Sequence, residues 1–66
     1  MTNVKRAEEL EKALAMLAKS NALLGAEEDA DGFYAACIAE NLELMERKRA
    51  ELAHCRERIA AGHLED

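Results

Sequence analysis

Apolar residues recur along most of this chain at alternating intervals of three and four residues, the spacing of one face of an α-helix. In the first half these positions are Ala7, Leu10, Leu14, Leu17 and Leu24, and Asn3 and Asn21 occupy the same register. In the second half the stripe consists of Tyr34, Ile38, Asn41, Met45, Lys48, Leu52, Cys55 and Ile59. Two such stripes restrict the chain to two helices that pack along a shared seam.

The pattern is interrupted once, between residues 25 and 32. We therefore predict one helical-hairpin domain over residues 1–66, with a helix over 3–24, a turn over 25–32, a helix over 33–61 and a tail over 62–66. Because the turn is short, the helices should lie antiparallel. The residues that suit the helix ends are Thr2 or Asn3, Gly25 as a left-handed C′ residue, Asp29 or Asp31, and Gly62 as the second C′ residue.

Composition supports the same fold class. The 66 residues include 14 alanines, no proline, no tryptophan, one Phe and one Tyr. Strong helix formers therefore dominate, and the β-branched and aromatic residues of a β-sandwich are scarce. We predict an all-α, two-helix antiparallel hairpin that pairs into a dimeric four-helix bundle or docks on a partner protein.

The net charge is −5, which disfavours binding to nucleic acid or to an anionic membrane. No apolar run approaches the roughly 18 residues that a membrane-spanning helix needs, and the first residues lack the apolar stretch of a signal peptide. We expect a cytoplasmic protein in which Cys37 and Cys55 are reduced. Since they lie 18 residues apart on one predicted helix, they should not bond to each other.

A second apolar patch lies outside the seam in the half of the hairpin near the turn. Its members are Met16 and Leu23 on the first helix, Phe33, Cys37 and Leu44 on one side of the second, and Leu42 on the other side. Such a patch usually marks an interface. A homodimer would cover it, and so would a helical surface or groove of another protein.

Catalytic and metal-binding patterns are weak. Glu51 and His54 have the Glu-x-x-His spacing of di-iron bundles, but both project away from the apolar stripe, so we expect them to be idle surface residues. The acidic turn resembles the start of a calcium loop, but its twelfth position is Ile38 instead of glutamate. We expect no enzyme activity, no cofactor and no bound metal.

One family resemblance runs from residue 10 to residue 46. The stretch from Leu10 to Lys19, then Gly25, then Tyr34 opening a helix with Glu40 and Glu43, resembles the small co-chaperones of type III secretion needle subunits. This resemblance implies a helical hairpin that binds a helical-repeat protein in the bacterial cytoplasm. Together the two proteins would keep a needle subunit unpolymerised.

Two further resemblances are less specific. In size, acidity and helical form the chain is similar to small phage-encoded inhibitors of the quorum-sensing anti-activator type, which sequester a host transcription activator in the host cytoplasm. Asp29-Ala30-Asp31 and Cys37 resemble the plasmid-copy-control RNA-binding hairpin, although the RNA-contacting aromatic residue of its first helix is missing here.

We interpret the chain as a non-catalytic protein–protein interaction module, a bacterial chaperone or adaptor that occupies a surface of a partner protein. The alternative is a phage-encoded inhibitor that sequesters a host regulatory protein, and an RNA-binding hairpin ranks below it. The residues predicted to bind the partner are Tyr34, Ile38, Asn41, Leu42 and Met45. Tyr34 combines a large apolar ring with a polar tip, as interface anchors do.

Overall fold

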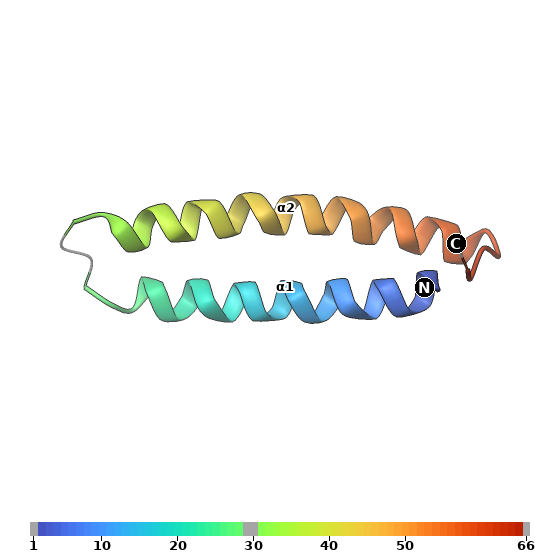
Figure 1. The fold of residues 1–66 in the computed structure, drawn as a ribbon, viewed down its shortest axis with the longest axis horizontal. Coiled ribbons are helices and arrows are strands. Elements are labelled where there is room, and N and C mark those ends of the chain that lie inside the picture. The colour runs from blue at the N-terminus through green and yellow to red at the C-terminus, as the bar shows by residue number, and fades with distance from the viewer. Residues whose placement is uncertain (1, 29–30, 66) are drawn as a thin grey trace.

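The computed structural model describes residues 2–28 and 31–65 and confirms the all-α helical hairpin. Helix α1 spans Asn3–Gly25 and helix α2 spans Phe33–Ala60. The two helices run antiparallel and side by side, with α2 the longer of the two (Figure 1), and form a rod of 50 × 16 × 14 Å. Both observed helices differ from their predicted ranges by one residue, at the C-terminal end.

The two predicted stripes meet in the seam between the helices. All buried residues of the helices lie on these stripes: Asn3, Ala7, Leu10, Met45, Leu52 and Cys55. Ala7, Leu10, Leu52 and Cys55 form one core cluster, against which Leu14 and Ile59 pack. This cluster lies in the half of the rod that contains both chain ends. We call this half, residues 2–14 and 48–65, the termini half, and the described residues between them the turn half.

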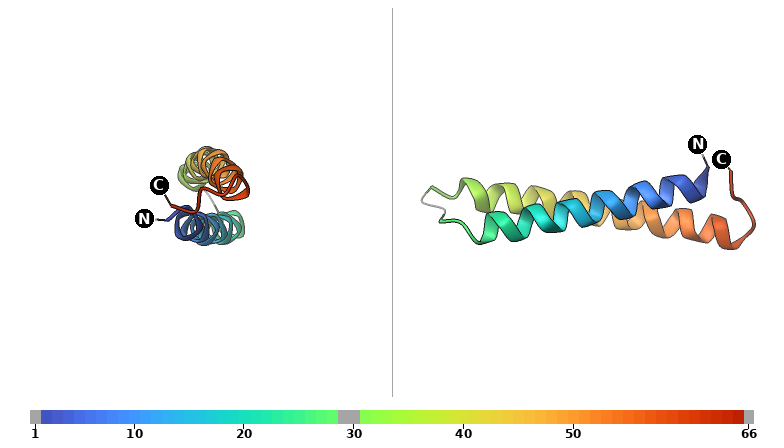
Figure 2. Two further views of the ribbon diagram at one scale, coloured as in Figure 1. Left: turned by 90° about the vertical axis from the view of Figure 1, so that its right-hand side faces the viewer. Right: turned by 90° about the horizontal axis from the view of Figure 1, so that it is seen from below.

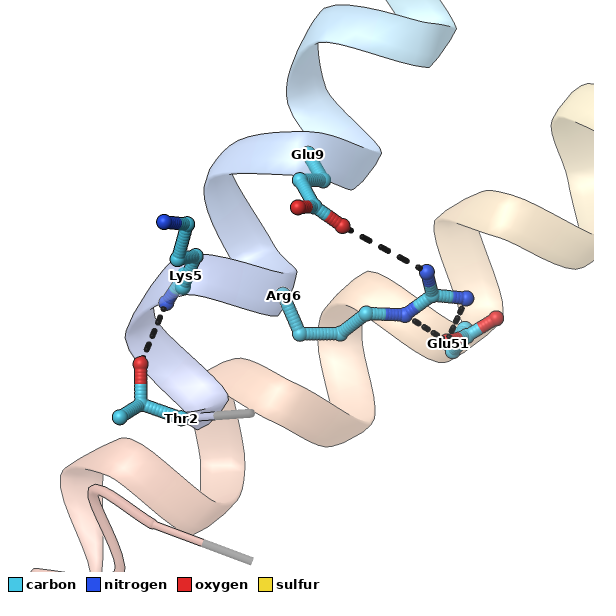
Figure 3. A network of polar contacts seen from close by, with 5 residues as sticks. All are labelled: Thr2, Lys5, Arg6, Glu9 and Glu51. Carbon is cyan, nitrogen blue, oxygen red and sulfur yellow. Dashed lines mark hydrogen bonds and ion pairs between the residues drawn. The ribbon is translucent and has the colours of Figure 1, made fainter.

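The start of α1 is held by two different side chains. Thr2 is the N-cap, and its hydroxyl accepts a hydrogen bond of 3.0 Å from the backbone N–H of Lys5 (Figure 3). Asn3 is 2% exposed, and its Nδ2 donates to the carbonyl oxygen of His63 at 2.6 Å. The backbone N–H of Asn3 donates to the carbonyl of Leu64 at 2.6 Å. The C-terminal residues therefore return to the start of α1, as Figure 2 shows.

Gly62 makes this return possible, in the role that the sequence predicted for it. Its φ is 90°, in the left-handed region. Its N–H donates to the carbonyl of Ile59 at 2.9 Å, and the N–H of His63 donates to the carbonyl of Arg58 at 2.8 Å. These two bonds form a Schellman motif, which satisfies carbonyls at the helix end and reverses the chain.

At the other end of the rod, the prediction for Gly25 is wrong. Gly25 is the last residue of α1 and has no positive φ, and the chain leaves the helix through Ala26 in the right-handed region. The left-handed residue is Gly32, with φ 80°, immediately before α2. The N-cap residue of α2 is therefore Gly32, which has no side chain to cap the helix, and the prediction of Asp31 as the cap is wrong. Asp31 stands one residue earlier, and its Oδ1 accepts from the N–H of Phe33 at 3.1 Å. The alternative cap, Asp29, lies outside the described residues.

Two ion pairs connect the helices across the termini half. Nη2 of Arg6 lies 2.6 Å from Oε2 of Glu51 (Figure 3), and Nη2 of Arg56 lies 3.0 Å from Oε1 of Glu11. Glu51 is therefore not the idle surface residue that its sequence position predicted. Its hydrogen bond to the guanidinium, followed by its charge, raises the pKa of Arg6 above the ordinary value.

Candidate protein-binding surface

The five residues predicted to bind a partner differ in how far the hairpin itself covers them. Leu42 is 52% exposed, and Tyr34, Ile38 and Asn41 are half-buried. Met45 is 5% exposed. Four of the five thus keep accessible surface in the hairpin, and Met45 lies beneath them in the seam.

A small polar layer holds Asn41 and Met45 toward α1. Nδ2 of Asn41 donates to Oδ1 of Asn21 at 2.9 Å, and Nδ2 of Asn21 lies 3.9 Å from Sδ of Met45. This layer sets the level at which the helices pair in the turn half. Because Leu42 follows Asn41 by about 100° around α2, it is turned out of the seam onto one flank of the rod.

On this flank, Leu42 is the large apolar side chain of the turn half that is exposed among alanines. Ala39 and Ala35 stand three and seven residues before Leu42 on α2, and Ala15, Ala18 and Ala22 lie on the facing edge of α1, all with exposed side chains. Glu46, four residues after Leu42, is exposed on the same side of α2 and ends this run of small residues. We call this surface the alanine flank, which consists of Ala15, Ala18, Ala22, Ala35, Ala39 and Leu42. Since the distance between packed helices depends on the side chains at their contact, this flank is shaped for the close approach of another helix.

The opposite flank of the turn half carries larger side chains. They fall on a second four-three spacing on each helix, and we call the surface the hollow flank: Met16, Ser20 and Leu23 on α1, with Phe33, Cys37, Glu40 and Leu44 on α2. Met16, Phe33 and Leu23 are 71%, 62% and 61% exposed. An open hollow of about 430 Å³ lies between the helices here, lined by Ser20, Leu23, Leu24, Cys37, Glu40 and Asn41.

The sequence signalled both flanks, because the second apolar patch includes residues of each. It did not signal the hollow. The spacing of residues shows which of them share a flank, but a depression between two helices depends on the side chains of both. Of the predicted binding residues, Leu42 lies on the alanine flank, Asn41 lines the hollow and Met45 lies in the seam, whereas the largest exposed side chains lie on the hollow flank.

The aromatic residues stand where α2 begins, beside the turn. The ring centroids of Phe33 and Tyr34 lie 6.0 Å apart, with the ring planes tilted by 57°. This geometry is within the range of favourable aromatic pairs. Because neighbouring helix positions diverge by about 100°, the two rings leave the helix in different directions, Phe33 toward the hollow flank and Tyr34 toward the seam.

The polar groups of the described residues gather into no metal-binding cluster of three or more His, Cys, Asp or Glu side chains. Cys37 is half-buried in the lining of the hollow, and Cys55 is buried in the core cluster; both thiols are free. The basic run at residues 47–49 is partly neutralised, since Arg47 lies 3.7 Å from Glu43. Apolar shape, more than reactive chemistry, distinguishes the turn half.

Within the part of the chain that the structure describes, neither helix has the length and apolar character needed to cross a membrane. Comparison with family models, with curated proteins and with solved structures yields no match to this chain.

Proposed function

We propose that this hairpin is a non-catalytic protein-binding module, an adaptor or chaperone of the bacterial cytoplasm that covers a helical surface of a partner protein. The observation that carries the proposal is the exposure of Leu42 in the middle of a flank of alanines. A partner helix laid on this flank approaches both α1 and α2 and surrounds Leu42 with apolar groups.

The energetics of interfaces favour a central anchor with a nearly neutral surround. Leu42 supplies the anchor, and the half-buried Tyr34 and Ile38 extend it along α2. Alanine loses no side-chain rotamer freedom when it is covered, so the surrounding residues add contact area at little entropic cost. The two free thiols suit a reducing compartment such as the cytoplasm.

The test is affinity capture from a bacterial lysate with the full chain as bait, followed by titration of the identified partner. The Leu42→Asp and Ala18→Glu variants should lose that partner, because each places an uncompensated charge in the contact. The matched control, Met16→Glu, changes the hollow flank and should retain the partner.

Titration then measures the role of the aromatic anchor. Tyr34→Ala should keep the helical content, and should weaken binding by about 2 kcal/mol or more, roughly thirtyfold. If partner capture survives both charge substitutions on the alanine flank, this flank is not the binding surface and the proposal is wrong.

A further inference from the structure

We propose that the hollow flank binds the hollow flank of a second copy of this chain, so that two turn halves form a four-helix bundle with both turns at the same end. This inference is independent of the proposed function, which uses the opposite flank. It depends on the exposed apolar side chains, on the size of the flank and on the positions of the charges at its edges.

The apolar side chains come first. Met16, Leu23 and Phe33 each expose more than half of their surface. Leu23 lines the hollow with Leu24, Cys37 and three polar residues, and Met16 and Phe33 lie one helical turn before Ser20 and Cys37 of that lining. In an isolated hairpin these groups stay in contact with water, and their burial is favourable in proportion to the apolar area removed. A two-fold arrangement lets the same side chains of both copies fill each other's hollow.

The size of the flank sets how strong such a pairing can be. Half of the 50 Å length and the 16 Å width give a face of roughly 400 Å² in projection, against the roughly 800 Å² of accessible surface per partner in a standard stable interface. Projecting side chains such as Met16 and Phe33 raise the accessible area above the projected area. The hollow flank is therefore at the low end of interface sizes, and the dimer should be weak and dependent on concentration.

The charges at the edges decide the orientation. Lys19 lies on the outer edge of α1. On α2, Glu40 lines the hollow, and Glu43 lies on the outer edge, 3.7 Å from Arg47. The Asn21–Asn41 hydrogen bond fixes the register of the hairpin. Lys19 precedes Asn21 by two residues and Glu43 follows Asn41 by two, so in antiparallel helices they lie at the same level along the rod.

A half-turn about the long axis keeps this level and exchanges the two helices. It lays α1 of one copy over α2 of the other and brings each Lys19 level with Glu43, close to Glu40 of the second copy. A half-turn about the short axis of the flank instead lays α1 on α1 and α2 on α2, so that lysine meets lysine and glutamate meets glutamate. Opposite charges favour the first arrangement and like charges oppose the second, which places both turns at one end.

The experiment is sedimentation equilibrium of the full chain over a concentration series, with helical content measured by circular dichroism. We expect a dimer at micromolar concentration. Leu23→Asp should raise the dissociation constant by roughly a hundredfold or more through a buried unpaired charge. Met16→Glu should also weaken the dimer. If Leu23→Asp loses helical content, the dissociation constant of Met16→Glu tests the proposal instead. The control Leu42→Asp should remain dimeric.

Orientation is tested by a charge-exchange cycle. Lys19→Glu should weaken the dimer, and adding Glu43→Lys to the same chain should restore it toward the original dissociation constant. A wild-type monomer at every concentration overturns the proposal, as does a dimer that Leu42→Asp disrupts and Leu23→Asp leaves intact. A double variant that dimerises no better than Lys19→Glu overturns the arrangement with both turns at one end.

Discussion

The two halves of this hairpin follow the same four-three spacing but differ in what covers the seam. In the termini half, the returning tail bonds to Asn3, and the Arg6–Glu51 and Glu11–Arg56 ion pairs border the core cluster. Helical spacing places Glu51 in line with Leu44 of the hollow flank, and Glu11 in line with Ala15 of the alanine flank. Each flank is thus ionic in one half of the rod and apolar in the other.

The difference shows how two helices alone can divide stability from binding. A chain of fewer than about 70 residues gains only a few kcal/mol from a single core. Two helices share one seam, so they cannot cover every apolar side chain internally. Among the described residues, four of the five buried apolar side chains lie where the chain ends meet, and the three most exposed large apolar ones, Met16, Phe33 and Leu23, lie in the turn half. The termini half holds the fold, which leaves the turn half available for contacts.

The largest expected effect is the loss of stability when a leucine of the seam is truncated, and it should differ between the two halves. Leu52→Ala removes a side chain from the core cluster and should destabilise the hairpin by about 2 to 5 kcal/mol, enough to melt much of it. Leu24→Ala, at a half-buried seam position of the turn half, should cost about 1 kcal/mol because less area is removed from contact. Thermal unfolding followed by circular dichroism measures both, and equal losses would contradict the division described here.

The tail contact is the next largest effect. Asn3→Asp keeps the shape of the side chain but removes the N–H donor to the carbonyl of His63, and should cost about 1 to 3 kcal/mol. An acidic residue at a helix N-terminus is otherwise favourable, so a loss at this buried position reports the broken hydrogen bond together with the carboxylate brought against the carbonyl oxygen of His63. Urea unfolding measures the loss, and hydrogen exchange at the N–H groups of Asn3 and His63 should accelerate.

Its counterpart in the turn half is Asn41→Ala, which removes the bond between Asn41 and Asn21. Because both residues are half-buried and water can replace the lost partner, the expected cost is smaller, about 0.5 to 1.5 kcal/mol. If Asn41→Ala costs more than Asn3→Asp in the same urea series, the polar layer, and not the tail, is the stronger of the two contacts.

Substituting alanine for Gly62 and for Gly25 should change the stability of the hairpin in opposite directions. Gly62 has φ 90°, so Gly62→Ala should destabilise by about 1 to 2 kcal/mol and release the tail, even though space for a Cβ is open. Gly25 ends α1 in a right-handed conformation with nothing within 4 Å of a built Cβ. Gly25→Ala should therefore stabilise by about 0.5 kcal/mol. Midpoints that shift in the same direction in both variants would refute this assignment of roles.

The sequence predicted the parts of this structure that depend on helical periodicity. The stripes of the seam follow from residue spacing alone. Gly62 was predicted as the C′ residue because it stands just after the last position of the second stripe. The turn was harder to predict, because either Gly25 or Gly32 can adopt a left-handed conformation. Which of them does so depends on the path of the chain between the helices, and residue spacing does not determine that path. The spacing identified two apolar flanks near Leu42 and Phe33, but not the hollow between α1 and α2.

Contacts between distant positions could not be predicted in this way. Arg6 and Glu51 lie 45 residues apart in the sequence, and each has nearer partners of opposite charge on its own helix. The return of the tail depends on a buried amide at Asn3, a position that the sequence equally suits to capping. Both contacts depend on which residues of α1 lie opposite which residues of α2. The side chains in the seam determine this register.

The smallest expected effect concerns the ion pairs, again compared between the halves. Glu51→Gln weakens the bonds of 2.6 Å to Arg6 across the helices, whereas Glu43→Gln affects a 3.7 Å contact to Arg47 within α2. Both sites are exposed, so we expect a small drop in the thermal midpoint for Glu51→Gln and none resolved for Glu43→Gln. About 1 M salt should remove the difference, because exposed charges are then screened within roughly 3 Å.

Since Glu51 raises the pKa of Arg6, the stabilisation from Arg6 is complete below its unfolded pKa and is lost only as pH rises through its folded pKa. The titration of Arg6 should therefore leave the stability difference unchanged between about pH 6 and 9. A difference that persists in high salt would show that Glu51 acts through packing and not through its charge.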